Sequence, residues 1–221
     1  MAQVLALGDC NMSGDVKFKN NSYPERFSGC IGKSVKNAGY TMSTTREMQY
    51  LFKDHYTKEC EIILIQFGLV DSWKTFKYAP YVLYYPDNPL RKIFRKIVKK
   101  YKKIAKELKL NDLLGAQNVV GIEEYKKNIE QIISTVSKKT VILIDTVPNH
   151  QLFRNDEIVK YNDVLDKLSK QYNYCYKLDI YNEFLENMDK YYLDETHIND
   201  EGYEVITQKL VSLYQSIEES S

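Results

Sequence analysis

The sequence has few cysteines, and none lies in the spacing that metal or redox motifs use. The four are Cys10, Cys30, Cys60 and Cys175, and no two form a C-x-x-C pair. This spacing argues against a zinc knuckle or a thioredoxin-type motif. A disulfide framework is not expected either, because such frameworks belong to short, densely cross-linked chains. We therefore expect free thiols in a reducing compartment, no metal site and no organic cofactor.

Long apolar runs and an excess of one charge are also missing. No run of about 18 apolar residues occurs, so we expect no membrane-spanning segment. The N-terminus has no basic region and reaches Gly8 after a few apolar residues, which is too short for a signal peptide. We therefore expect a cytoplasmic protein. The 31 Lys and Arg residues balance 30 Asp and Glu residues, which argues against a general nucleic-acid binder.

The chain does contain short apolar runs that alternate with helical patterns. Its 221 residues indicate a single domain, 1–221, that can bury a core without cross-links. The alternation predicts an α/β fold with a parallel sheet and helices on both faces. Ligands of such sheets bind beyond the carboxyl ends of the strands. The apolar runs are 4–7, 34–37, 62–67, 141–144 and 174–178, and the helical patterns are 44–54, 90–110, 122–137, 156–171 and 200–216.

The turn after the first apolar run carries a candidate nucleophile. Its sequence is Gly8-Asp9-Cys10-Asn11. A helix N-terminus at this point would favour a thiolate at Cys10. The alternative is a buried cysteine that fills space, the usual environment of this residue. Ser13 is a weaker candidate, because it lies almost a full helical turn beyond Cys10.

A second group of polar residues lies near the C-terminus. The chain has three histidines, and His197 follows Asp194 by three residues, just before a predicted helix. In a tight turn, Asp194 can hold one ring nitrogen of His197 while the other nitrogen faces a nucleophile. That is the arrangement of a catalytic triad. A D-x-x-H sequence alone is a weak signal, since a histidine in a polar loop is more often a surface residue.

Taken together, these segments resemble the SGNH/GDSL hydrolase family. The family has Gly-Asp-Ser after its first strand, a Gly in a second block, G-x-N-D in a third, and D-x-x-H near the C-terminus. The corresponding segments here are Gly8-Asp9-Cys10, Asn37-Ala38-Gly39, Gly68-Leu69-Val70-Asp71 and Asp194 to His197. The resemblance implies a three-layer, flavodoxin-like fold with a five-stranded parallel sheet of order 2-1-3-4-5. The chain departs from the family pattern at Cys10, which replaces Ser, and at Val70, which replaces Asn.

The resemblance also implies roles for individual residues. Cys10 would be the nucleophile, His197 the general base and acid, and Asp194 the group that orients His197. The backbone N–H groups of Cys10 and Gly39 would form the oxyanion hole. Val70 cannot supply the third donor of the family, although Gln66, Asn11 or Asp71 could compensate. We expect the substrate site to be lined by Asp9, Asn11, Gly68, Val70, Asp71 and Trp73.

Three functions are compatible with this pattern. The first is an acyl-ester or thioester hydrolase with a Cys-His-Asp triad, acting on a small-molecule or carbohydrate acyl substrate. The second is an acyltransferase that moves an acyl group from a thioester donor, an acyl-CoA or acyl carrier protein, to a sugar or amine. The third is an inactive binding module that keeps the fold and has lost the chemistry.

A long insert, about 72–139, separates the third block from the fourth. Its first part is rich in aromatic residues, which either line the mouth of the active site or pack as a surface loop. These residues are Trp73, Phe76, Tyr78, Tyr81, Tyr84 and Tyr85. The stretch 91–110 holds ten Lys and Arg residues and one Glu, with apolar residues at helical spacing. It predicts either an amphipathic helix that contacts an anionic membrane or phosphorylated ligand, or a helix packed in the core with a solvated basic face. The segment 179–204, with nine acidic residues and one Lys, could neutralise it.

Overall fold

The computed structural model describes residues 2–14 and 17–220, and its centre is one parallel sheet. The strand order β2-β1-β3-β6-β7 is that of the predicted 2-1-3-4-5 sheet, which is confirmed. Strands β1 and β3 pair from Val4 with Ile62 to Gly8 with Gln66, and every residue of both is buried. Their unbroken apolar sequences are what burial on both faces requires. The strands are β1 (Val4–Gly8), β2 (Val35–Asn37), β3 (Ile62–Gln66), β6 (Thr140–Ile144) and β7 (Cys175–Leu178).

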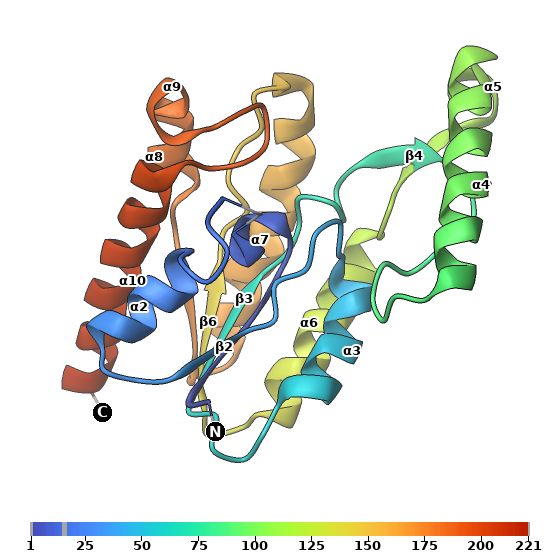
Figure 1. Ribbon diagram of the computed structural model, residues 1–221. Coiled ribbons are helices and arrows are strands. Elements are labelled where there is room, and N and C mark those ends of the chain that lie inside the picture. Colours follow the sequence, from blue (N-terminus) through green and yellow to red (C-terminus); the bar gives the residue numbers. More distant parts are fainter. Residues whose placement is uncertain (1, 15–16, 221) are drawn as a thin grey trace.

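Helices cover both faces of the sheet and complete three layers (Figure 1). Alternate residues of β1 show the two faces, because Leu5 and Leu7 belong to one core cluster while Val4 and Ala6 belong to the other. The first cluster is closed by α3 (Thr45–His55), α6 (Ile122–Thr135) and α7 (Asn155–Gln171). The second is closed by α2 (Tyr23–Cys30) and α10 (Asp200–Glu219).

Several short elements follow the carboxyl ends of the strands. After β1 comes α1 (Cys10–Ser13), after β6 comes the 3-10 turn η1 (Leu152–Arg154), and after β7 come α8 (Tyr181–Glu186) and α9 (Met188–Tyr191). Each of these helices spans six residues or fewer, too short for the periodicity of the sequence to reveal them. They lie at the carboxyl edge of the sheet, where proteins of this architecture bind their ligands.

The insert leaves the sheet between β3 and β6. Strands β4 (Lys74–Phe76) and β5 (Ala116–Asn118) form an antiparallel pair, and between them lie α4 (Pro89–Glu107) and α5 (Leu110–Leu114). Figure 1 shows α4 and α5 standing apart from the helices that cover the sheet. The remainder of the expected insert, α6, returns to the core.

Two expectations about the basic stretch 91–110 are wrong. Packing in the core by its apolar side does not occur, because Ala105 is the one buried residue of α4. Neutralisation by the acidic segment 179–204 does not occur either. That segment lies on the opposite side of the molecule (Figure 1), and no ion pair joins the two within the ranges that the structure covers. None of the helices described is both long and apolar enough to cross a membrane.

Candidate active site

The turn after β1 positions Cys10 at the carboxyl edge of the sheet. Asp9 caps α1 by accepting a hydrogen bond from the Asn11 N–H at 3.0 Å. Gly8 is required by close packing, since a Cβ there would lie 2.6 Å from Met12 Cβ and 2.9 Å from the carbonyl oxygen of Gln66. Cys10 is 6% exposed and packs with Leu69 and Ile158. Cys10 is therefore fixed in place, with a small part of its surface open.

The loop before α10 holds the second half of the site. Asp194 Oδ1 accepts hydrogen bonds from the N–H groups of Thr196 and His197, both at 2.8 Å, and Asp194 Oδ2 lies 2.8 Å from His197 Nδ1. Burial raises the pKa of Asp194, but the hydrogen bonds from His197 and Thr196 outweigh it and hold the pKa below its ordinary value. An ionised Asp194 places the ring proton on Nδ1 of His197, which leaves Nε2 to act as a base.

Asn11 joins these two segments. Its side-chain Nδ2 donates to the carbonyl of Thr196 at 3.2 Å, and its Oδ1 accepts from the Ile198 N–H at 3.2 Å. Asn11 is the neighbour of Cys10 in the chain, and Thr196 and Ile198 are the two neighbours of His197. These two hydrogen bonds therefore bring Cys10 close to His197 and to its partner Asp194. Within the described chain, the ring of His197 is hydrogen-bonded to Asp194 alone and not to the Cys10 thiol. Asn11, expected in the substrate site, is thus engaged in joining the two halves.

The comparisons with known proteins concern this fold. No protein-family model matches the sequence, and no curated protein matches it. Solved structures do: a lipase/acylhydrolase from Enterococcus faecalis has a TM-score of 0.68 at 17% identity, over 98% of this chain and 96% of that one. A lipolytic protein of the G-D-S-L family from Veillonella parvula has a TM-score of 0.64 at 12% identity, over 96% and 97%. This chain has the SGNH hydrolase fold.

A third solved structure with this fold is that of an enzyme whose reaction is named. It is a catalytic mutant, with serine changed to alanine, of an acetylxylan esterase from Geobacillus stearothermophilus. It matches with a TM-score of 0.63 at 14% identity, over 96% of this chain and 93% of that one. A second catalytic mutant of the same esterase replaces a histidine by alanine. At these identities the matches establish the fold.

The surroundings of the thiol in this SGNH-fold protein disfavour its ionised form. Burial, followed by the nearby Asp9 carboxylate, raises the pKa of Cys10 well above its ordinary value. The expectation that a helix N-terminus would favour a thiolate is therefore wrong. Helix α1 has four residues, and the N–H bonds of Cys10 and Asn11 do not outweigh the buried acid. Ser13 is no better placed, because its hydroxyl donates to the Cys10 carbonyl at 2.9 Å.

The loop after β2 departs from the expected oxyanion hole. The N–H of Gly39 donates to Asn37 Oδ1 at 2.9 Å and is not free for a substrate. Gly39 serves close packing instead, since a Cβ there would lie 2.5 Å from the backbone nitrogen of Ser13. Met42, three residues later, has a φ of 63°, and its N–H has no partner in the described chain. Sequence patterns give no sign of Met42, because this left-handed conformation usually favours glycine.

The loop holding Met42 is fastened against the end of β1. The Tyr40 N–H and the Ser43 hydroxyl both donate to the Gly8 carbonyl, each at 3.0 Å. Gly8 lies two residues before Cys10. The N–H of Met42, which has no partner in the described chain, therefore belongs to a loop that is hydrogen-bonded to the end of β1, just before the Cys10 turn.

The loop after β3 is anchored inward. Asp71 Oδ1 accepts from the N–H and hydroxyl of Thr45, at 2.9 and 2.7 Å, and so fixes the start of α3. Gly68 has a φ of 136°, and a Cβ there would lie 2.4 Å from Thr146 Oγ1. Val70 is buried and offers no donor. Gln66 cannot compensate, because it accepts from Tyr23 Oη at 2.8 Å and donates to the Asp145 carbonyl at 3.1 Å.

Burial dominates the electrostatics beneath the site. It raises the pKa of Asp9 to about 7 and the pKa of Asp71 to about 7. Asp71 Oδ2 is buried and has no hydrogen-bond partner among the residues that the structure describes. The two side chains are 2% and 0% exposed. Asp9 and Asp71, both expected in the substrate site, therefore point into the fold.

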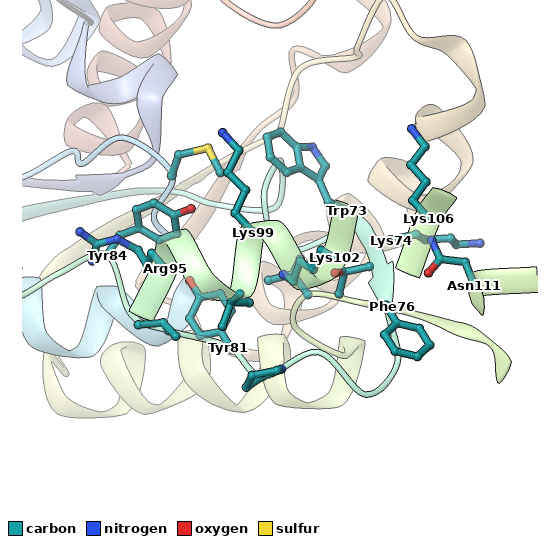
Figure 2. A pocket seen from close by; sticks show the side chains of 16 residues that line it. Trp73, Lys74, Phe76, Tyr81, Tyr84, Arg95, Lys99, Lys102, Lys106 and Asn111 are labelled. Atoms are coloured by element: carbon teal, nitrogen blue, oxygen red, sulfur yellow. The ribbon is translucent and has the colours of Figure 1, made fainter. Parts of the chain in front are cut away.

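A cleft of about 350 Å³ lies between α4, β4 and the aromatic part of the insert. Figure 2 shows Trp73, Phe76, Tyr81 and Tyr84 around it, with basic side chains from α4. Met42 and Trp73 also line it, whereas Cys10 and His197 do not. Of the aromatic residues expected at the mouth, Tyr78 and Tyr85 lie outside the lining. The basic residues that line the cleft are Lys74, Arg95, Lys99, Lys102 and Lys106.

Charged and polar groups of the cleft lack partners. Arg95 is held by Asp87 at 2.5 Å, but Lys99, Lys102 and Lys106 form no ion pair within residues 2–14 and 17–220. Burial lowers the pKa of Lys102. Trp73 Nε1 is buried and has no hydrogen-bond partner in the described chain. Such groups are stabilised when a ligand supplies the missing acceptors.

Proposed function

We propose that the protein is an SGNH-type acyl-ester or thioester hydrolase that works through Cys10, His197 and Asp194. The observation that carries the proposal is the Asp194–His197 pair at 2.8 Å, on a loop fastened to the Cys10 turn by both polar atoms of Asn11. Structures of the same fold include catalytic mutants of an esterase in which a serine and a histidine are replaced. Those residue types correspond to Cys10 and His197, with cysteine in place of serine.

The reaction requires His197 to remove a proton, because the pKa of the Cys10 thiol is raised. As Sγ bonds to the acyl carbon, the thiol proton passes to His197 Nε2, and the Asp194 carboxylate stabilises the imidazolium. When the tetrahedral intermediate collapses, the bond to the leaving oxygen or sulfur breaks and that atom takes the proton. Water then attacks the thioester on Cys10 with His197 again as base. The carboxylic acid leaves, and the thiol is restored.

We assign the oxyanion contacts to the N–H groups of Cys10 and Met42. The Gly39 N–H is engaged by Asn37, whereas the Met42 N–H has no partner among the residues described and its loop is hydrogen-bonded to Gly8. The Asn of the family pattern is absent at Val70, and loss of one oxyanion donor lowers kcat by about 10²–10³-fold in a serine enzyme. We therefore expect a slow enzyme that favours activated esters and thioesters.

The substrate that best fits the cleft is polar and negatively charged. Three lysines without ion pairs and the unpartnered Trp73 N–H favour a carboxylate, phosphate or charged sugar beside aromatic rings. The same cleft supports the second candidate function, acyl transfer, in which a phosphate-bearing thioester such as an acyl-CoA acylates Cys10 and a sugar or amine replaces water.

The test is acylation of the protein by p-nitrophenyl acetate and by a short acyl-CoA, followed by intact mass. We expect one acetyl adduct and turnover in the wild type, and neither in Cys10→Ala. Cys30→Ala is the matched control, because Cys30 is an exposed free thiol distant from α1 in sequence, and it should behave as the wild type. Asp194→Asn should retain the fold and lose on the order of 10³–10⁴-fold in kcat.

Each contrary outcome points to a different function. If wild type and Cys10→Ala are equally inert, the protein is a binding module. If Cys10→Ala keeps its activity, another nucleophile acts. If the adduct forms but is released only when a sugar or amine is added, the protein is an acyltransferase.

A further inference from the structure

Helix α4 exposes a continuous row of large apolar side chains. Seven of them, 40–68% exposed, form what we call the apolar stripe: Leu90, Ile93, Phe94, Ile97, Tyr101, Ile104 and Leu108. At 3.6 residues per turn these positions cover about 100° of the helix circumference, so they form one face. Within α4, Ala105 alone is buried, and Tyr101 touches Phe76 at a ring distance of 5.7 Å. The helix is thus attached to the domain along one margin of the stripe, at Ala105 and Tyr101, and the rest of the stripe stays exposed.

In another long helix, by contrast, the apolar residues are buried. In α6, Ile129, Ile132 and Ile133 are each at most 1% exposed, in the core against the sheet. Full burial of one such side chain is worth roughly 1.5–3 kcal/mol. Contiguous apolar surface of this kind marks a site of interaction. The stripe therefore calls for an occupant that residues 2–14 and 17–220 do not provide.

The charge beside the stripe restricts what that occupant can be. Helix α4 contains nine Lys and Arg residues and one acidic residue, Glu107. On the solvent side of the stripe lie Lys96 and Lys100, exposed and without ion pairs in the described chain. On the other flank lie Arg95 and Lys102, which line the cleft. An occupant must offer an apolar interior and a negatively charged rim.

A second copy of the chain does not meet that requirement. Two α4 helices joined along their stripes would place two sets of nine cations side by side, and like charges at such distances repel. A bilayer with anionic lipids has both features. An amphipathic helix in its interface buries the apolar face among the acyl chains and keeps lysines at the headgroups.

We propose that α4 lies in the interface of an anionic lipid membrane, with the apolar stripe among the acyl chains and Lys96 and Lys100 at the headgroups. Nineteen residues give a helix about 28 Å long that lies flat and does not span. This docking is independent of the chemistry at Cys10. Because the cleft opens on the other flank of α4, docking places that cleft beside the lipid surface (Figure 2).

The experiment is co-sedimentation with vesicles of phosphatidylcholine alone and of phosphatidylcholine mixed with phosphatidylserine, at low and high salt. We expect binding to the mixed vesicles at low salt, and at least tenfold weaker binding to neutral vesicles or at high salt. The pair Ile93→Gln and Ile97→Gln should weaken binding more than tenfold. The pair Lys96→Gln and Lys100→Gln should weaken it about 30-fold, since each lysine near such a surface contributes about fivefold.

Matched controls come from exposed residues elsewhere. Leu185 on α8 is 41% exposed, and Lys167 on α7 is exposed without an ion pair in the described residues. The pair Leu185→Gln and Lys167→Gln should bind as the wild type, and circular dichroism checks the fold of every variant. The proposal is overturned if the wild type does not bind anionic vesicles. It is also overturned if the Ile93 and Ile97 variants bind as strongly as the wild type. A dimer in light scattering that the Ile93 and Ile97 changes abolish, without vesicle binding, assigns the stripe to a second copy.

Discussion

At the scale of single residues, the surroundings of Cys10 act on its thiol in opposite directions. Burial, followed by the carboxylate of Asp9, opposes formation of a thiolate, whereas in the proposed mechanism the His197–Asp194 pair takes the proton during attack. A neutral thiol resists oxidation and alkylation between turnovers, because the thiolate is the reactive form. The arrangement resembles the protonated nucleophile of a serine enzyme more than a preformed thiolate.

The first prediction concerns the pH dependence of alkylation at Cys10. In Cys30→Ala, which removes the exposed thiol, we expect the rate of Cys10 alkylation by iodoacetamide to keep rising above pH 9. The reason is that a raised pKa leaves little thiolate at lower pH. Limited access slows the reaction at every pH but does not move the inflection. Mass spectrometry of the Cys10 peptide over a pH series gives the inflection.

Asp9→Asn provides the comparison for that measurement. The substitution keeps an oxygen that can cap α1 and removes the second cause of the raised pKa. We expect the inflection for Cys10 to move to lower pH in this variant. An inflection below pH 8 in the parent protein would contradict the prediction.

At the scale of elements, the insert builds the cleft by bringing α4 alongside the aromatic segment. Glu47 of α3 anchors that segment, because its carboxylate accepts from Tyr81 Oη at 2.9 Å and from the Tyr84 N–H at 2.7 Å. Arg95 ties α4 to the same segment through the Leu83 carbonyl at 2.8 Å. These bonds keep the lysines of α4 in the same cleft as the aromatic rings, so the charge of the cleft depends on the position of α4.

The second prediction concerns Lys102. We expect Lys102→Gln to raise KM for a carboxylated or phosphorylated ester by about tenfold or more, since a hydrogen bond to a charged group contributes about 1.5–3 kcal/mol. The kcat of the same ester and the KM of a neutral ester should change little. Steady-state kinetics with a matched pair of charged and neutral esters measures this, with Lys167→Gln as control. Equal changes in KM for both esters would show that Lys102 stabilises the fold and does not bind an anion.

At the scale of the whole molecule, the carboxyl edge of the sheet accumulates buried acids. Asp9, Asp71 and Asp145 follow β1, β3 and β6, and burial raises the pKa of each to about 7. At these three groups the folded state therefore binds more protons than the unfolded state between pH 4 and pH 7. The free energy of unfolding from these groups falls as the pH rises through that window. Each pKa unit corresponds to about 1.4 kcal/mol.

The third prediction tests this effect at Asp71. Asp71→Asn keeps an acceptor for Thr45 and cannot ionise, so it removes one of the three contributions. We expect its Tm to rise relative to wild type by several degrees as the pH increases from 5 to 8, at about 2–4 °C per kcal/mol. Thermal denaturation followed by circular dichroism measures the difference, and other carboxylates cancel in it. A Tm difference that is the same at both pH values would contradict the prediction.

The sequence by itself determined the parallel sheet and the long helices, and the resemblance to the SGNH/GDSL family supplied the strand order. Apolar runs such as 62–66 and helical periodicities such as 122–135 encode burial directly, because each residue faces the core or solvent according to its own polarity. It also brought Cys10, Asp194 and His197 forward as candidates, because each lies at a strand end or in a short local motif.

Only the tertiary structure decided how those residues are used. The raised pKa of Cys10, the engaged N–H of Gly39 and the free N–H of Met42 depend on contacts between loops distant in the chain. The same holds for α4, whose periodicity predicts one apolar face but not whether the domain covers it. The spacing of apolar residues shows which face of a helix is able to be buried. Whether that face is buried depends on the segments that pack against it.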